Sequence, residues 1–182
     1  YWHNFLMKIL TYLFLFLFCI FSNNLYAEIF YIDIDKIINQ TNVGRYINEE
    51  FQNTKKKNNT SSLKTKSELK KREESLIAQK NILDENEFNK KIDIFRQDVS
   101  KFNQINQKKN KDLQNKLLNN KNNFLKLIEP ILIEYVTNNN ITYLLQKKYI
   151  IIGHNDLNKT SDIIKLVDKK INISNFNDSI SK

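Results

Sequence analysis

Residues 51–127 carry apolar side chains at a sparse helical spacing. In the second half of this stretch the apolar positions alternate steps of four and three, at Phe88, Ile92, Phe95, Val99 and Phe102. In the first half, leucines lie seven residues apart, at Leu69, Leu76 and Leu83. Both patterns are typical of helices with a narrow apolar seam. The polar residues 84–87 separate the two halves, so we predict a long antiparallel helical hairpin with its tip there.

The predicted seam is interrupted in the middle of the hairpin. Asn106 and Lys109 stand where the heptad pattern needs apolar residues, and residues 55–62 are polar without any seam. Because polar seam residues loosen a coiled coil, we predict mobile arms. We favour a fraying helix over 55–62, and a disordered linker is the alternative. Pro130 removes a backbone hydrogen bond, so we predict that the helix kinks or restarts at the root of the hairpin.

The segments on either side of the hairpin, residues 28–50 and 128–171, are predicted to form a β-rich body. Runs of β-branched and aromatic residues indicate three strands, at 28–34, 141–145 and 149–152. A short turn separates the last two, which therefore form a β-hairpin, and the first strand joins them in one sheet. The fold class is thus α+β: a long antiparallel helical hairpin that projects from a small β-sheet body.

Helices complete the predicted body. Thr41 or Asn42 can cap the helix that leads into the hairpin, and Thr160 or Ser161 can cap a last helix over 162–170. Residues 172–182 are predicted to be a loose tail. A body this small is a marginal core for two long arms, and the open edges of its sheet offer a route to assembly. We therefore expect a homo-oligomer.

Residues 1–27 have the features of a secretory signal peptide. A basic start at Lys8 leads into an apolar run over 9–21, and Ala27 ends the segment. We predict cleavage after Ala27 and export of the mature chain. Residues 1–6 precede the methionine and resemble untranslated upstream sequence. The apolar run is short for a membrane span of about 20 residues, and an uncleaved membrane anchor is the alternative.

The positive charge of the chain belongs to the hairpin. Of a net charge of +9 for the whole chain, residues 55–126 carry 19 basic and nine acidic side chains, a local net charge of +10. A basic surface points to acidic partners: nucleic acid, anionic lipid or acidic polypeptides. Export argues against nucleic acid. A solvated helical face without any partner is the simpler reading of each single lysine.

The residues that could carry chemistry are few and isolated. Cys19 lies in the predicted signal peptide, so the mature chain has no cysteine, and His154 is its only histidine. Asp33 and Asp35 follow a strand, as in some Mg²⁺ sites, but no second acidic cluster accompanies them. No phosphate-binding loop, dinucleotide fingerprint or catalytic triad pattern is present. We therefore predict no enzyme, no cofactor and no metal site.

Three groups of segments resemble the Skp/OmpH family of periplasmic chaperones. They are the mature start at 29–34 with Gly44, the tip at 83–91 with Phe95, and the closing segments 128–131, 141–145 and 160–164. The resemblance implies a homotrimer whose strands build a β-barrel-like core. It also implies that three helical hairpins enclose a cavity that holds unfolded outer-membrane proteins in the periplasm, without ATP.

The hairpin has residues suited to holding an unfolded client protein. A sparse apolar stripe offers many weak contacts, and basic side chains attract clients of negative charge. The candidate client-binding residues are Lys70, Lys71, Arg72, Lys90, Lys91, Phe88, Phe95 and Phe102. The alternative, which we favour, is that the three phenylalanines pack inside the hairpin with Ile92 and Val99, and clients would then contact flanking positions. Anionic lipid is a further possible partner.

Two other functions remain open at this point. The chain could be a structural coiled-coil protein of the envelope, tethered by an uncleaved N-terminal segment. It could also be a basic nucleic-acid binder, which export disfavours.

Overall fold

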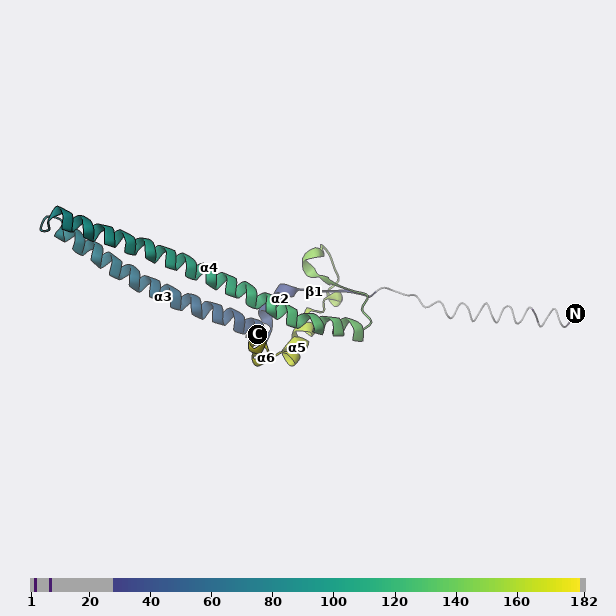
Figure 1. Ribbon diagram of the computed structural model, residues 1–182. Coiled ribbons are helices and arrows are strands. Elements are labelled where there is room, and N and C mark those ends of the chain that lie inside the picture. The colour runs from purple at the N-terminus through teal and green to yellow at the C-terminus, as the bar shows by residue number, and fades with distance from the viewer. Residues whose placement is uncertain (1, 3–6, 8–27, 181–182) are drawn as a thin grey trace.

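The computed structural model describes Trp2, Met7 and residues 28–180. Apart from Trp2 and Met7, the predicted signal peptide lies outside these residues. The elements are β1 (Ile29–Ile32), α2 (Ile34–Gln40), α3 (Asn42–Gln79), α4 (Glu85–Asn138), β2 (Tyr143–Gln146), the short 3-10 turns η1 (Lys147–Tyr149) and η2 (Asn155–Leu157), α5 (Thr160–Lys170) and α6 (Ile173–Ile180). Helices α3 and α4 extend together away from a small body that holds the other elements (Figure 1).

The predicted helical hairpin is confirmed. Helix α3 has 38 residues and α4 has 54, which correspond to lengths of about 57 Å and about 80 Å. They lie side by side along α3, and the chain turns between Gln79 and Glu85 (Figure 1). The Asp84 side chain caps α4 by accepting a hydrogen bond of 2.9 Å from the Asn86 N–H. The tip therefore lies a few residues before the predicted one, and Glu87 belongs to the first helical turn, where acidic residues are favourable.

Both long helices continue through their predicted weak points. Helix α3 includes all of residues 55–62, so the fraying that we expected there is not seen. This stretch has no glycine or proline to end a helix. Helix α4 crosses Pro130 without restarting. Ile128 and Ile131, on either side of the proline, are buried in the core, so their packing holds the helix across the missing hydrogen bond.

The sheet has two parallel strands in the part of the chain that the structure describes. Ile29 of β1 lies opposite Tyr143 of β2, and the register continues to the ends of both strands. The predicted β-hairpin is wrong, because 149–152 form no strand and the chain leaves β2 through η1. Ile151 and Ile152 are 98% and 91% exposed. A run of β-branched residues indicates an extended chain, but a strand also needs a partner edge, which these residues do not have here.

The core of the protein lies at the root of the hairpin. There α2, α5 and α6 pack against the lower parts of α3 and α4, as Figure 1 shows. The clustered buried side chains are those of Ile32, Ile37, Val43, Ile47, Phe124, Ile128, Ile131, Ile163, Val167, Ile171 and Phe176. Each fully buried aliphatic or aromatic side chain of this kind contributes about 1.5–3 kcal/mol. The core therefore draws on every helix of the body and on both arms.

The corner between α2 and α3 determines where the first arm begins. Thr41 is buried and caps α3, since its hydroxyl accepts a hydrogen bond of 3.3 Å from the Gly44 N–H. Of the two predicted caps, Thr41 is the one used. Gly44 is required at this corner, because a Cβ atom there would lie 1.5 Å from the carbonyl oxygen of Ile38.

The start of α5 departs from the prediction. Lys159 occupies the cap position without a side-chain cap bond, so neither Thr160 nor Ser161 caps this helix. The buried Thr160 hydroxyl has another role: it accepts a hydrogen bond of 2.9 Å from the Asp33 N–H and donates one of 2.6 Å to Asn158 Oδ1. The end of β1 is thereby joined to the start of α5.

The loose tail predicted over 172–182 is also wrong where the structure describes it. Residues 173–180 form α6, which packs on the roots of α3 and α4. Phe176 is fully buried, and its ring meets that of Phe124 edge-to-face with centroids 6.1 Å apart. A single aromatic side chain among polar residues therefore fixes the end of the chain. Residues 181–182 lie outside the described residues.

Replacing Gly44 with alanine should destabilise the protein. The added methyl group would meet a backbone oxygen that cannot move independently, so the α2–α3 corner must shift, and we expect a loss of about 1–3 kcal/mol or more in the free energy of unfolding. Urea denaturation measures this loss. Gly153→Ala is the matched control, because its Cβ would meet only side-chain atoms, at 3.2 Å or beyond. Equal stabilities of the two variants would contradict the assigned role of Gly44.

Replacing Phe176 with alanine should cost about 3–5 kcal/mol, because the change leaves a cavity against Phe124. Thermal and urea denaturation measure the effect. Ile173→Ala on the same helix is the control, since Ile173 is 39% exposed and should lose much less. A loose tail would instead make both substitutions neutral.

Candidate functional site

The two arms pack closely only near the body. Leu113 is buried there between the helices, and Ile47, Phe51 and Leu117 surround it. The space left among these side chains has a volume of only about 10 Å³. Of residues 51–127, only Leu113 and Phe124 are buried. Beyond this point the seam consists of side chains that are at most half-buried.

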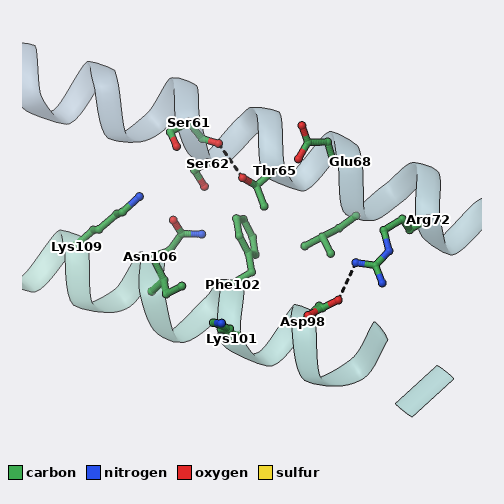
Figure 2. Close-up of a pocket in the computed structure, with 12 residues that line it drawn as sticks. Ser61, Ser62, Thr65, Glu68, Arg72, Asp98, Lys101, Phe102, Asn106 and Lys109 are labelled. Atoms are coloured by element: carbon green, nitrogen blue, oxygen red, sulfur yellow. Dashed lines mark hydrogen bonds and ion pairs between the residues drawn. The ribbon is translucent and has the colours of Figure 1, made fainter. Parts of the chain in front are cut away.

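A groove opens between α3 and α4 in the middle of the arms. Its volume is about 410 Å³. Asn106 and Lys109, the two predicted interruptions of the seam, both line it from α4. Ser61, Ser62 and Thr65 line the opposite side on α3 (Figure 2). Small polar side chains do not fill the space between two helices, so the interrupted seam produces a groove there.

The groove has an apolar side and a polar side. Leu69, Phe102 and Ile105 supply the apolar surface. Phe102 points from α4 toward α3, as Figure 2 shows, and Ile105 is 42% exposed. The side chains of Ser62 and Asn106 are half-buried, and neither makes a hydrogen bond with another residue that the structure describes. Their polar atoms are therefore available to a ligand.

An ion pair joins the arms at the outer end of this groove. Arg72 Nη1 on α3 lies 2.7 Å from Asp98 Oδ2 on α4 (Figure 2). Further out, Lys91 Nζ donates a hydrogen bond of 3.2 Å to Gln79 Oε1 across the hairpin and lies 3.6 Å from Glu87. Polar contacts between α3 and α4 thus accompany the half-buried seam residues of the outer arms.

The candidate phenylalanines lie along the seam. Phe88, Phe95 and Phe102 are all half-buried, which agrees with the alternative that they belong to the inside of the hairpin. Only Phe102 among them also lines the groove.

The candidate basic residues fall into two groups. Lys70 lies 3.9 Å from Glu74, and Arg72 and Lys91 take part in the contacts between the arms. Lys71 and Lys90 are exposed and have no ion-pair partner among the residues that the structure describes. The structure therefore does not gather the predicted residues into one site. It leaves Lys71 and Lys90 available for an acidic partner.

Sequence reasoning missed the exposed apolar residues of the hairpin. The large ones are Leu63, Ile77, Ile82, Ile94, Ile105 and Leu118, with 42–79% of their surface exposed. Leu63, for example, is 68% exposed. These apolar residues lie outside the heptad positions of the seam. Their place in the sequence could therefore have predicted that they are exposed.

The possible chemical groups stay apart. Asp33 caps α2 by accepting a hydrogen bond from the Lys36 N–H, and the His154 imidazole lies 3.0 Å from the Asp156 carboxylate. Within residues 28–180 with Trp2 and Met7, no three side chains gather as a metal site would require.

The same residues include no helix that is long and apolar enough to span a membrane. Burial, and secondly the Asp162 carboxylate, raise the pKa of Tyr135 in the body.

The sequence matches a known protein family over most of its length. The family is described as outer membrane protein (OmpH-like), and the match covers residues 28–167. The chain belongs to the OmpH-like family. The predicted resemblance is therefore confirmed, and α6 lies beyond the matched part. No curated protein matches the chain in sequence.

A solved structure shares the fold. It is a candidate outer membrane chaperone (OmpH-like) from Caulobacter crescentus CB15, with a TM-score of 0.67 and 11% sequence identity. The similarity covers 80% of this chain and 86% of that chain. At this identity the likeness shows a common fold, with long helices and a small two-stranded sheet in the present chain.

The Arg72–Asp98 ion pair should contribute little to stability. Both side chains are about half exposed, at 51% and 41%, so solvent screens their attraction, and we expect a coupling energy of about 0.2–1 kcal/mol. A double-mutant cycle with Arg72→Gln and Asp98→Asn measures it. The Arg96–Asp93 pair within α4 is the control for an ion pair that does not join the arms. A coupling well above this range would mean that the pair holds the hairpin closed.

Proposed function

We propose that the chain is a periplasmic holdase chaperone that keeps unfolded outer-membrane proteins soluble and needs no ATP. Membership of the OmpH-like family supports a chaperone role. The observation that carries the proposal is the surface of the hairpin: of residues 51–127 only two are buried, so these long helices do not build a core of their own. They present their side chains to the surroundings instead.

The chemistry of this surface suits an unfolded chain. Single exposed apolar residues are spread along both arms and offer contacts that are each weak. Many weak contacts to one chain add up, because each contact raises the effective concentration for the next. The net charge of +10 over residues 55–126 attracts clients of negative charge and speeds their encounter. Such binding needs neither a nucleotide nor a discrete catalytic group.

The body supports the proposal that the chain assembles, as a homotrimer with a β-barrel-like core. Tyr149, Ile151 and Ile152 are 75%, 98% and 91% exposed in the segment that follows β2. Adjacent exposed apolar side chains next to open sheet edges are typical of surfaces that another chain covers. Three copies would then place three hairpins around one cavity.

Export with cleavage after Ala27 belongs to this proposal and places the chain in the periplasm, away from nucleic acid. Anionic lipid stays a possible second partner of the lysines. A structural envelope coiled coil is the rival function. The half-buried seam and the groove between the arms argue against a rigid structural rod, which would have a continuous apolar seam.

The function is tested on the mature chain with a urea-unfolded β-barrel membrane protein. We expect the chain to suppress aggregation after dilution of the urea, without ATP. Mass measurement in solution should give three chains in the free protein and three chains plus one client in the complex. A stable monomer, or aggregation that proceeds unchanged, would contradict the proposal.

Charge reversal tests how the arms attract clients. Lys71→Glu with Lys90→Glu should slow the association with an acidic client several-fold at low salt, because neither side chain has an ion-pair partner within the described part of the chain. The difference should vanish at high salt, where charges are screened. Lys36→Glu with Lys165→Glu, at exposed positions of the body, is the matched control and should leave the rate nearly unchanged.

A further inference from the structure

We propose that the groove between α3 and α4 is a discrete anchor site for the client. It binds a short extended segment of the unfolded chain that carries an aromatic side chain next to acidic residues. This inference rests on the proposed holdase function and deepens it. Each hairpin then holds its client at one defined place as well as through scattered surface contacts.

The groove has the dimensions of a binding site. Its volume of about 410 Å³ contrasts with the space of about 10 Å³ that remains between the same helices near the body. Ligand pockets typically measure about 300–1,000 Å³. The Arg72–Asp98 contact lies at one end of it and the buried Leu113 at the other. The groove is thus bounded along the hairpin by contacts between the arms.

The apolar side of the groove fits an aromatic side chain. Leu69 and Ile105 accompany Phe102, whose ring points from α4 toward α3 (Figure 2). Leu69 belongs to α3, where the small polar residues Ser62 and Thr65 also line the groove. Ile105 is 42% exposed, so part of this apolar surface stays open to solvent. An aromatic ring that enters here covers this surface and pairs with the Phe102 ring, an arrangement that aromatic side chains favour.

The polar side fits an extended backbone. A chain segment that leaves water needs partners for its N–H and C=O groups. The Asn106 amide offers both a donor and an acceptor, and the Ser62 hydroxyl can act as either. Neither side chain has a hydrogen-bond partner among the described residues, so binding need not break a bond inside the protein.

The surrounding charge selects acidic segments. The two spans that line the groove, 61–72 and 98–109, carry eight basic and two acidic side chains, a net charge of +6. Asp98 is paired with Arg72, which leaves Glu68 as the other acidic group. Successive side chains of an extended chain point to opposite sides. An aromatic residue can therefore enter the groove while its acidic neighbours face the lysines around it. Strands of outer-membrane barrels alternate apolar and polar residues and have aromatic girdles.

Filling the groove tests the inference. Ser62→Leu with Asn106→Leu would supply the missing seam residues, so this variant should unfold at a higher temperature and yet lose the site. The probe is a fluorescent peptide of alternating Phe and Asp, and its anisotropy reports binding to the full mature chain. We expect the filled variant to bind the peptide about tenfold more weakly. If the double variant does not fold, Asn106→Leu alone should weaken binding in the same direction.

The matched control adds the same leucines outside the groove. Ser67→Leu with Asn103→Leu lies at exposed positions of the same two spans and should keep the native affinity. Peptides with Lys in place of Asp, or Ala in place of Phe, should bind much more weakly than the probe.

Several results would overturn the inference. The first two are that the native chain does not bind the probe, or that the filled variant binds it as tightly as the native chain does. The others are that the control variant loses as much affinity as the filled variant, or that the native chain binds the Lys peptide as tightly as the probe. Displacement of the probe by anionic phospholipid vesicles but not by unfolded barrel protein would assign the groove to a lipid headgroup instead. Suppression of aggregation by the native chain is measured in parallel. Its failure would contradict the holdase function, whereas its success beside a failed peptide test would contradict the groove alone.

Discussion

The hairpin depends on the core at its root, because only Leu113 and Phe124 of residues 51–127 are buried. Phe124 of α4 is fully buried there, with Val43 and Ile47 from α3 in the same cluster and the Phe176 ring of α6 against it. Each such side chain contributes about 1.5–3 kcal/mol. The stability of the chain is therefore concentrated at one end of the hairpin. The outer arms are free to carry residues that a self-supporting coiled coil could not tolerate.

In the middle of the arms, polar residues interrupt the seam and leave a groove. Ser62 and Asn106 stand where apolar residues would close the seam, and the groove of about 410 Å³ is the result. The helices stay side by side beyond it, with the Arg72–Asp98 pair as one of the contacts that join them. Exposed ion pairs of this kind contribute at most about 1 kcal/mol. A weak seam and an open groove are thus two consequences of the same residues.

The strongest local patterns predicted the structure best. The heptads gave the hairpin, since Phe88 and its successors at seam spacing lie half-buried between the helices. The failures concern residues whose state depends on distant partners. Residues 149–152 have β-propensity but no strand beside them, and Phe176 has an undistinguished local context but meets Phe124. The sequence predicted the residues on only one side of the groove. Asn106 marked one side, but the register between the helices decides what faces it.

The two kinds of exposed apolar residues on this chain call for different partners. In the body, Ile151 and Ile152 are adjacent and almost fully exposed. A contiguous apolar surface is an aggregation hazard unless a stable neighbour covers it. On the arms, residues such as Leu63 and Ile94 stand singly among charged and polar side chains, which is compatible with solubility. Lasting assembly therefore fits the body, and reversible contact fits the arms. Because the two surfaces lie on different parts of the chain, the proposed client would not compete with the proposed contacts between copies.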